Sequence, residues 1–285
     1  MSQIRRKRGK SGIVGNAVLL LVILTLAAYM VLPLLYTVNN AFKPINELFL
    51  FPPRIFVQNP TLNNFIELFG LLNSTAIPFA RYFFNTLFVT LVGTVGQIVF
   101  ASMCAYSISK IPYPGADIIF KIIVLSLMFS SVVTAVPNYI IMSKLKLIDT
   151  YLAIILPSWQ TPLGLYLMKQ FMESTIPDEI LDAARIDGAN ELTVFFRIVM
   201  PLLKPAWFTL MIFSVQSLWN IVSPYTFSEK LKTLPQALSQ IVSGGMIRSG
   251  AGSAIALLMV AVPITCFVIT QSNIIQTMST SGMKG

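Results

Sequence analysis

The sequence contains no histidine, and only 11% of its 285 residues are charged. The lack of histidine excludes Ser-His-Asp and Cys-His catalysis, and also metal sites that depend on histidine ligands. Soluble domains carry about 25% charged residues, so the low charge content excludes an ordinary soluble globular protein. The hydrophobic content of 55% excludes a disordered chain.

Cysteine is also scarce, with Cys104 and Cys266 both lying in apolar runs. This placement indicates small hydrophobic residues buried in a membrane, and it fits neither a disulfide framework nor a zinc site. We therefore expect this chain to hold no metal and no catalytic residue. The net charge of +9 would suggest nucleic acid in a soluble protein. In a membrane protein it reflects Lys and Arg retained on the cytoplasmic side, so we expect no nucleic-acid partner.

Six long intervals contain no Asp, Glu, Lys or Arg. A helix needs about 20 mostly apolar residues to cross a bilayer. The sequence therefore predicts an all-α membrane protein with six transmembrane helices. Their centres are expected near Ile23, Leu91, Leu127, Ile155, Phe213 and Val260. The next longest interval, 233–247, is too short and too polar to cross.

These intervals predict the organisation of the chain. We expect a basic cytoplasmic tail at 1–12, a first transmembrane helix at 13–38, an outer loop at 39–81, a five-helix core at 82–276 that includes a cytoplasmic loop at 172–201, and a cytoplasmic tail at 277–285. The basic residues of the first tail place the N-terminus inside, and six crossings return the C-terminus to the same side. The apolar core of the first helix is longer than that of a signal peptide, so we expect it to be retained.

The cytoplasmic loop holds six of the eleven acidic residues, and its pattern predicts a helix, a turn and a second helix. Pro177 suits a first helical turn, and Gly188 can take the left-handed conformation that ends a helix. Asn190 is a candidate N-cap for the second helix, which we expect to end at Pro201. Each helix carries apolar residues at helical spacing: Ile180, Ala183 and Ala184 on the first, and Leu192, Phe195, Phe196 and Val199 on the second. Such a hairpin could lie on its own bundle or dock a partner.

The spacing in this loop is more specific than its amphipathicity. It reads Asp182-Ala183-Ala184, three residues, Gly188, nine residues, and then Ile198-Val199-Met200-Pro201. This pattern resembles the EAA loop of ABC importer permeases, with Asp182 in place of the usual Glu and Met200 in place of Leu. Both replacements are mild. The chain from about residue 82 onward is most similar to the smaller maltose-type permease of carbohydrate importers, which shares the tail at 281–285 and the triplet Thr233-Leu234-Pro235.

The resemblance implies a type I (MetI-like) importer permease that forms half of the path for an oligosaccharide by alternating access. It implies a second homologous permease, two ATPase subunits and an extracellular or periplasmic solute-binding protein as partners, in a bacterial or archaeal cytoplasmic membrane. ATP and Mg would be bound by the ATPase subunits and no cofactor by this chain. The sequence is consistent with this division, because it contains no Gly-x4-Gly-Lys-Ser/Thr loop.

The resemblance also implies roles for individual residues. Residues 177–189 would form a coupling helix for the ATPase, with the motif carried by Asp182, Ala183, Ala184, Gly188, Ile198 and Pro201. Arg185 and Asp187 would be edge contacts of that helix or part of a solvated face. The tail would reach the ATPase or form a disordered terminus; its residues are Ser281, Gly282, Met283, Lys284 and Gly285.

Polar and aromatic residues inside the predicted spans are candidates for the solute path. They are Gln97, Ser131, Trp159, Gln160, Gln216, Trp219 and Asn220. Aromatic faces can stack on sugar rings and amides can bind hydroxyls, which suits an uncharged carbohydrate. The same residues can instead hydrogen-bond helices to one another.

Other classes of protein fit the sequence less well. An ion-coupled secondary transporter usually keeps ionisable residues within the membrane, and these spans have essentially none. A membrane-embedded enzyme would lack the residues for the usual acid–base and metal chemistry. An ABC permease for a non-sugar solute remains open, because the coupling motif does not distinguish solutes.

Overall fold

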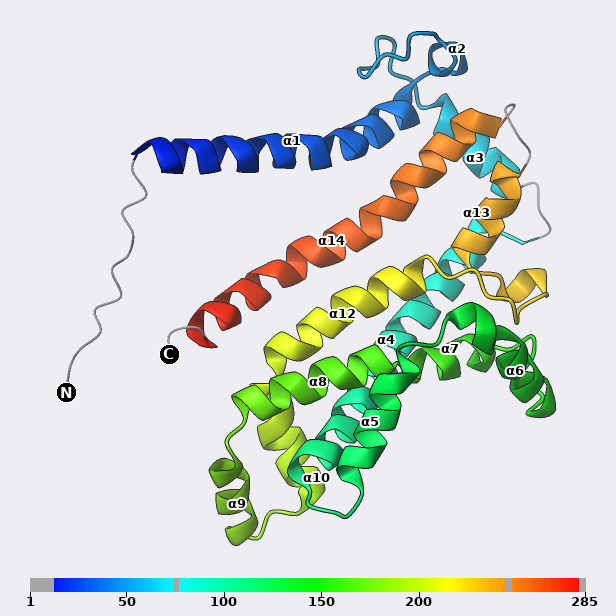
Figure 1. Cartoon of the computed structure of the whole chain (residues 1–285). Coiled ribbons are helices and arrows are strands. Elements are labelled where there is room, and N and C mark those ends of the chain that lie inside the picture. The colour runs from blue at the N-terminus through cyan, green and yellow to red at the C-terminus, as the bar shows by residue number, and fades with distance from the viewer. Residues whose placement is uncertain (1–12, 74–76, 244–247, 282–285) are drawn as a thin grey trace. The chain divides into compact units, whose positions relative to one another are not determined.

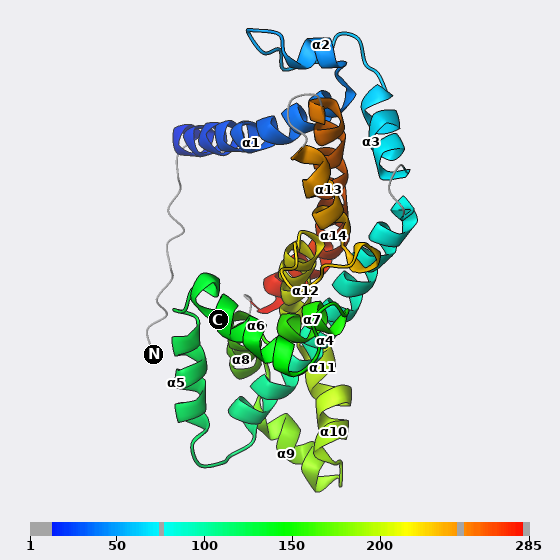
Figure 2. The same ribbon diagram turned by 90° about the vertical axis from the view of Figure 1, so that its right-hand side faces the viewer.

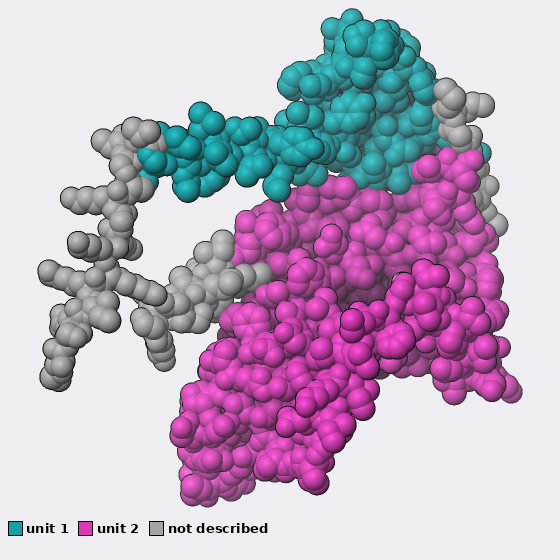
Figure 3. All heavy atoms as spheres, viewed as in Figure 1, with its two compact units in different colours: residues 1–68, 245–257 teal, residues 69–244, 258–285 magenta. Residues whose placement is uncertain are grey.

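The computed structural model of the chain (Figure 1) describes residues 13–73, 77–243 and 248–281. All regular secondary structure in these residues is helical, which confirms the predicted all-α fold. The chain divides into two compact units, Met1–Leu68 with Gly245–Leu257, and Phe69–Gly244 with Leu258–Gly285 (Figure 3). Of the described residues, 248–257 group with the N-terminal unit in this division, and the predicted core at 82–276 stays a prediction.

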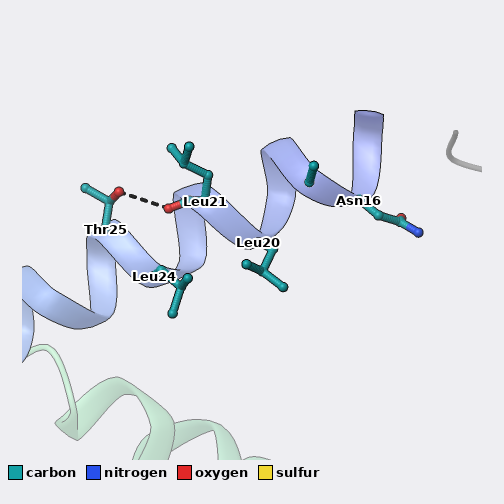
Figure 4. Close-up of a pocket in the computed structure, with 6 residues that line it drawn as sticks. Asn16, Leu20, Leu21, Leu24 and Thr25 are labelled. Atoms are coloured by element: carbon teal, nitrogen blue, oxygen red, sulfur yellow. Dashed lines mark hydrogen bonds between the residues drawn. The ribbon is translucent and has the colours of Figure 1, made fainter. Parts of the chain in front are cut away.

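The N-terminal unit is dominated by α1 (Ile13–Phe42), which starts where the sequence predicts and runs four residues beyond the predicted end. The side chains of residues 15–36 are all exposed. A surface hollow along this helix is lined only by its own side chains, which point outward from a single helix (Figure 4). This exposed apolar stretch needs lipid or another chain to cover it. The unit also holds α2 (Ile45–Leu48) and the start of α3 (Asn63–Asn73).

The larger unit is built around α4 (Phe79–Lys110), which packs against α7, α8 and α12. Its other elements are α5 (Ala116–Ser126), α6 (Ser131–Lys144), α7 (Leu152–Trp159), α8 (Pro162–Thr175), α9 (Asp178–Ile186), α10 (Glu191–Val194), a π-helix η1 (Phe195–Val199), α11 (Met200–Leu202), α12 (Lys204–Trp219), a 3₁₀ turn η2 (Glu229–Leu231) and α13 (Leu234–Val242). The last helix, α14 (Ser249–Ser281), begins in the first unit and continues in the second.

Three helices among the described residues are long and apolar enough to cross a membrane. They are Gly15–Phe42, Phe79–Lys110 and Ser249–Gln271. A fourth is obtained if Glu191–Leu202 and Lys204–Trp219, which meet at 79°, count as one bent span. The presence of membrane-spanning helices agrees with the sequence, whereas the count of six stays a prediction.

The two predicted spans centred near Leu127 and Ile155 are not continuous helices. The first is interrupted between α5 and α6, where the Ser130 hydroxyl caps α6 by accepting a hydrogen bond from the Val132 amide at 3.3 Å. The second is interrupted between α7 and α8, at the two residues before Pro162. A proline disfavours helical backbone in the residue before it, so α8 has to start anew at Pro162. Hydropathy does not detect these breaks, because the residues on both sides are apolar.

Candidate functional site

The helix α9 and the turn after it occupy one end of the larger unit (Figures 1 and 2). Pro177 precedes the helix in extended conformation, with Asp178 and Glu179 in the first turn. Gly188 has a φ of +83°, as predicted for a residue that ends a helix in the left-handed region. Asn190 caps α10 by accepting a hydrogen bond from the Thr193 amide at 2.7 Å, which confirms the predicted N-cap.

Helix α9 is held on the core by one residue that the predicted stripe did not include. Leu181 is fully buried in a hydrophobic cluster with residues of α4, α8 and α12, and Ala184 packs against the same cluster. Ile180 and Ala183 are exposed, so of the apolar stripe at 180, 183 and 184 only Ala184 packs on the core. Ile186 is 86% exposed at the end of the helix. The outer face of α9 is therefore an apolar and acidic surface that the described part of the chain leaves uncovered.

The second helix of the loop also differs from its predicted pattern. Phe195 and Val199 are buried as predicted, together with Val194, but Leu192 and Phe196 are more than half exposed. A π-helix runs through Phe195–Val199, and its wider turn departs from the 3.6-residue period from which the stripe was predicted. Pro201 does not end the helix: it lies inside α11, and the sharp bend follows at Leu203. The wider turn accommodates a proline that cannot donate a backbone hydrogen bond.

A polar network joins α9 to α10 and α4. Arg185 donates from Nε to Glu191 Oε1 at 2.9 Å and from Nη1 to Asp182 Oδ1 at 3.0 Å. Glu191 Oε2 in turn accepts a hydrogen bond from the Tyr106 hydroxyl near the end of α4. Glu191, and then Asp182, raise the pKa of Arg185, so the guanidinium stays charged. Arg185 therefore faces its own chain, where the sequence allowed an edge contact or a solvated face.

Lys110, the last residue of α4, makes a second connection to α9. Its ammonium donates to Asp178 Oδ1 at 2.7 Å and to the Ile176 carbonyl at 2.6 Å. Its own carbonyl accepts a hydrogen bond from Arg185 Nη2 at 3.4 Å. The sequence did not single out Tyr106, Lys110 or Glu191 as site residues. The one available signal was the position of Glu191 in the first turn of α10, where a negative charge is favourable at a helix N-terminus.

The network predicts that two substitutions of Glu191 differ in their effect on stability. We expect Glu191→Ala to lower the free energy of unfolding by about 1–3 kcal/mol, because the Arg185 and Tyr106 donors lose their shared acceptor. Glu191→Gln should lose less stability, because its amide oxygen can still accept from Arg185 while its NH2 group donates to the Tyr106 hydroxyl. Tyr106→Phe should also lower the stability, because it removes the second donor to Glu191. The measurement is thermal unfolding of the detergent-purified chain. Tyr113→Phe is the matched control for Tyr106→Phe, because the Tyr113 hydroxyl makes no hydrogen bond within the described residues; equal losses from the two variants would contradict the network.

The remaining motif residues are distributed as follows. Asp182 and Asp187 are exposed on the outer side of α9, Gly188 is exposed in the turn, Ile198 packs partly against the core, and Pro201 is exposed. Gly282, Met283, Lys284 and Gly285 lie outside the described residues, as does the side chain of Ser281. The structure thus brings the motif together at one end of the unit, with its acidic members facing outward.

Two residues predicted for the solute path are instead used in helix contacts. Gln97 is buried, donates from Nε2 to Thr161 Oγ1 at 2.8 Å, and accepts from Ser214 Oγ at 2.7 Å. Trp219 is 1% exposed and donates from Nε1 to the Met259 carbonyl at 3.1 Å. Buried polar groups in an apolar bundle must find partners within the protein, which explains why these two side chains turn inward.

Other predicted path residues do line open space. Trp159 and Gln160 border a cavity of about 360 Å³ between α4, α5 and α8. Trp159 stacks on Phe100 with ring centroids 4.9 Å apart. Gln216 and Asn220 are exposed and lie one turn apart on α12, where Asn220 Nδ2 donates to the Gln216 carbonyl at 2.9 Å. Of Ser131 only the backbone, at the start of α6, is within the described residues.

The opposite end of α4 carries a matching set of hydrogen bonds. Asn85 Nδ2 donates to the carbonyls of Lys230 and Lys232, both at 2.9 Å. Thr86 Oγ1 accepts from the Leu234 amide at 2.7 Å. These bonds fix the segment around the Thr-Leu-Pro triplet, at the start of α13, to the beginning of α4.

An all-helical bundle with helices long and apolar enough to cross a bilayer defines an integral membrane protein. The chain belongs to the family of binding-protein-dependent transport system inner membrane components, whose family model matches residues 19–280. It is therefore a permease subunit of a transport system, as the sequence predicted.

Similar proteins agree with this family. The chain is 31% identical to the arabinooligosaccharides transport system permease protein AraQ of Bacillus subtilis (strain 168), over 90% of this chain and 94% of that protein. It is 27% identical to the galactooligosaccharides transport system permease protein GanQ of the same organism, over 91% of this chain and 92% of that protein. A crystal structure of a bacterial ABC transporter involved in the import of the acidic polysaccharide alginate contains a chain with the same fold, with a TM-score of 0.74 at 23% identity over 91% of this chain and 95% of that chain.

Proposed function

We propose that the chain is the permease subunit of an ATP-binding-cassette importer for an oligosaccharide. It forms half of the translocation path and works by alternating access. The similar proteins AraQ and GanQ are named as permeases for arabinooligosaccharides and galactooligosaccharides, which supports an oligosaccharide as the solute. The uncharged character of the exposed Gln160, Gln216 and Asn220 side chains suits a neutral solute that is recognised through its hydroxyl groups.

The single observation that carries the mechanism is that α9 is packed on the bundle on one face and exposed on the other. Its inner face is fixed to the core through Leu181 and to α4 through Arg185 and Lys110. Its outer face, with Ile180, Ala183, Asp182 and Ile186, is uncovered. A helix fixed on one side and free on the other can pass the movement of a partner to the bundle. We assign this outer face as the docking surface for an ATPase subunit.

The proposed complex has two permease subunits, two ATPase subunits and a solute-binding protein on the outer side of a bacterial or archaeal membrane. Both termini of this chain lie in the cytoplasm. ATP and Mg are bound and ATP is hydrolysed by the ATPase subunits, so this chain acts as a transport subunit rather than as an enzyme. The tail at 281–285 extends toward the ATPase and contributes to its stimulation.

The experiment is affinity purification of the tagged chain from detergent-solubilised membranes, followed by identification of the proteins that accompany it. We expect a second permease and an ATPase in stoichiometric amounts. The companion binding protein is then screened against neutral oligosaccharides and against amino acids. Purification of the chain alone or as a homo-oligomer would contradict the proposal, and a binding protein that takes only a non-sugar solute would replace the solute class.

A further inference from the structure

The segment that follows α1 is a folded loop with two buried charges. Lys43 is 2% exposed and donates to Asn40 Oδ1 at 2.8 Å and to the Arg54 carbonyl. Glu47 is 8% exposed and accepts hydrogen bonds from the Gln58 amide at 3.1 Å and from the Asn59 amide at 3.0 Å. The Gln58 amide is the largest cause that holds the pKa of Glu47 below its usual value, so Glu47 is ionised at neutral pH. We call residues 43–61, held by this pair of charges, the Phe51 loop.

The Phe51 loop turns its apolar side chains outward. Phe51 is 94% exposed and Phe56 is 70% exposed. The smaller exposed fractions of Phe49, Leu50 and Ile55 are 51%, 42% and 43%. These residues are close in sequence and belong to a loop whose interior is already filled by its own polar groups. Their exposure is therefore a feature of the folded loop, and five exposed apolar side chains on one short loop indicate a surface that is covered in the working protein.

The end of α1 fixes where this patch lies. Val57 donates its amide hydrogen to Asn39 Oδ1 at 3.2 Å, and Thr61 donates to the Phe42 carbonyl at 2.8 Å. The side chains of α1 are exposed throughout residues 15–36, and burial begins in the last turns of the helix. At 1.5 Å per residue this exposed stretch is about 33 Å long, close to the roughly 30 Å of the hydrocarbon layer, so the last turns that follow it lie near the lipid head groups. The Phe51 loop is tied to those last turns, and so it lies at the boundary between lipid and water.

We propose that the Phe51 loop is a membrane anchor that inserts Phe51 and Phe56 into the head-group region of the leaflet at the C-terminal end of α1. Aromatic residues are favoured at this depth, and Arg54 can keep its charge at the lipid phosphates. A lipid surface fits better than a protein that binds and leaves, because hydrogen bonds join the loop to the end of α1, whose side chains are exposed from residue 15 to residue 36. The anchor would hold the C-terminal end of α1 at a fixed depth during transport.

The test uses depth-dependent fluorescence quenching and needs no partner subunit. The background variant replaces Cys104 and Cys266 by Ser, so that a bimane label reacts with one introduced cysteine. Separate variants carry Phe51→Cys, Phe56→Cys, Leu24→Cys as a mid-membrane control, or Thr175→Cys as a water-exposed control. Each is reconstituted in vesicles of phosphatidylcholine and phosphatidylglycerol at a ratio of about 3:1.

We expect lipids with a spin label near the head group to quench the labels at 51 and 56 at least about twofold more than the label at 175. Iodide in the water should quench the label at 175 and leave the labels at 51 and 56 largely unaffected. Quenching of both loop labels by iodide alone would overturn the proposal. If the labels at 51 and 56 become protected from iodide only after a solute-binding protein is added, the exposed apolar side chains of the Phe51 loop contact that protein instead of lipid. Phe51→Cys and Phe56→Cys are separate variants. If one of them fails to insert into the vesicles, the other still tests the proposal.

Discussion

Substitution of Gly188 by Glu is expected to abolish transport while the chain still inserts and assembles with its permease partner. Gly188 has a φ of +83°, and no atom lies within 4 Å of the position that a Cβ would take. The added side chain therefore projects from the uncovered side of the α9 turn into the proposed ATPase surface. A reduction of uptake of about 100-fold corresponds to about 2.8 kcal/mol of lost docking free energy. The measurement is uptake in membrane vesicles, with membrane content determined by immunoblot.

Gly115 provides a matched control for this substitution. Its φ is +93°, and a Cβ at this position would also meet no atom within 4 Å. Gly115→Glu therefore introduces the same charge and a similar backbone strain, but between α4 and α5 rather than after α9. We expect it to retain most of the uptake. Equal loss in the two variants would attribute the effect to strain or charge, and normal uptake with Gly188→Glu would refute the docking surface.

Gly96→Ala is expected to destabilise the larger unit by about 1–3 kcal/mol, the range for overpacking a tight interior. A Cβ on Gly96 would lie 2.0 Å from Trp159 Nε1. The indole cannot move freely, because it donates to the Val92 carbonyl at 3.3 Å and stacks on Phe100. The substitution must therefore displace Trp159 and disturb the wall of the 360 Å³ cavity. Thermal unfolding in detergent, followed by tryptophan fluorescence, measures both effects.

The control for this substitution is Gly70→Ala in α3. No atom lies within 4 Å of the corresponding Cβ position. Because alanine is a better helix former than glycine, this change should leave the stability unchanged or raise it by up to about 1 kcal/mol. If Gly96→Ala unfolds at the same temperature as the parent chain, the close contact between α4 and Trp159 is wrong.

The features that sequence alone predicted correctly are those set by a few adjacent residues. Gly188 and Asn190 are examples, because the left-handed turn and the side-chain cap depend only on local backbone geometry. The end predicted at Pro201 and the continuous span predicted around Leu127 were wrong. The helix end near Pro201 and the break after Leu127 both depend on how the backbone compensates for a hydrogen bond that is missing or made to a side chain. A π-helix before Pro201 and a serine cap after Leu127 are structural solutions that hydropathy does not distinguish from the alternatives.

The polar network was not predicted because its members are distant in sequence. Tyr106 and Glu191 are 85 residues apart, and neither belongs to the motif that singled out the loop. The same limit explains Leu181: the spacing placed an apolar stripe at Ile180, Ala183 and Ala184, but the packing surface of α4 and α8 selected the adjacent face. For Gln97 and Trp219, the sequence allowed a path-lining role or a helix contact; it could not identify their hydrogen-bond partners, which lie on other helices, and the path-lining role stays a prediction.

The bonding at the two ends of α4 has a mechanical consequence. The helix has 32 residues, about 48 Å in length, and is tied to α9 through Lys110 at one end and to the 230–234 segment through Asn85 at the other. An α-helix resists stretching, so a displacement at one end can be accommodated only by tilting the whole rod or by breaking a terminal bond. The two ends of this unit therefore move together for as long as both sets of bonds hold. The stiffness of a single helix is enough to couple them, and no signal has to pass from residue to residue along it.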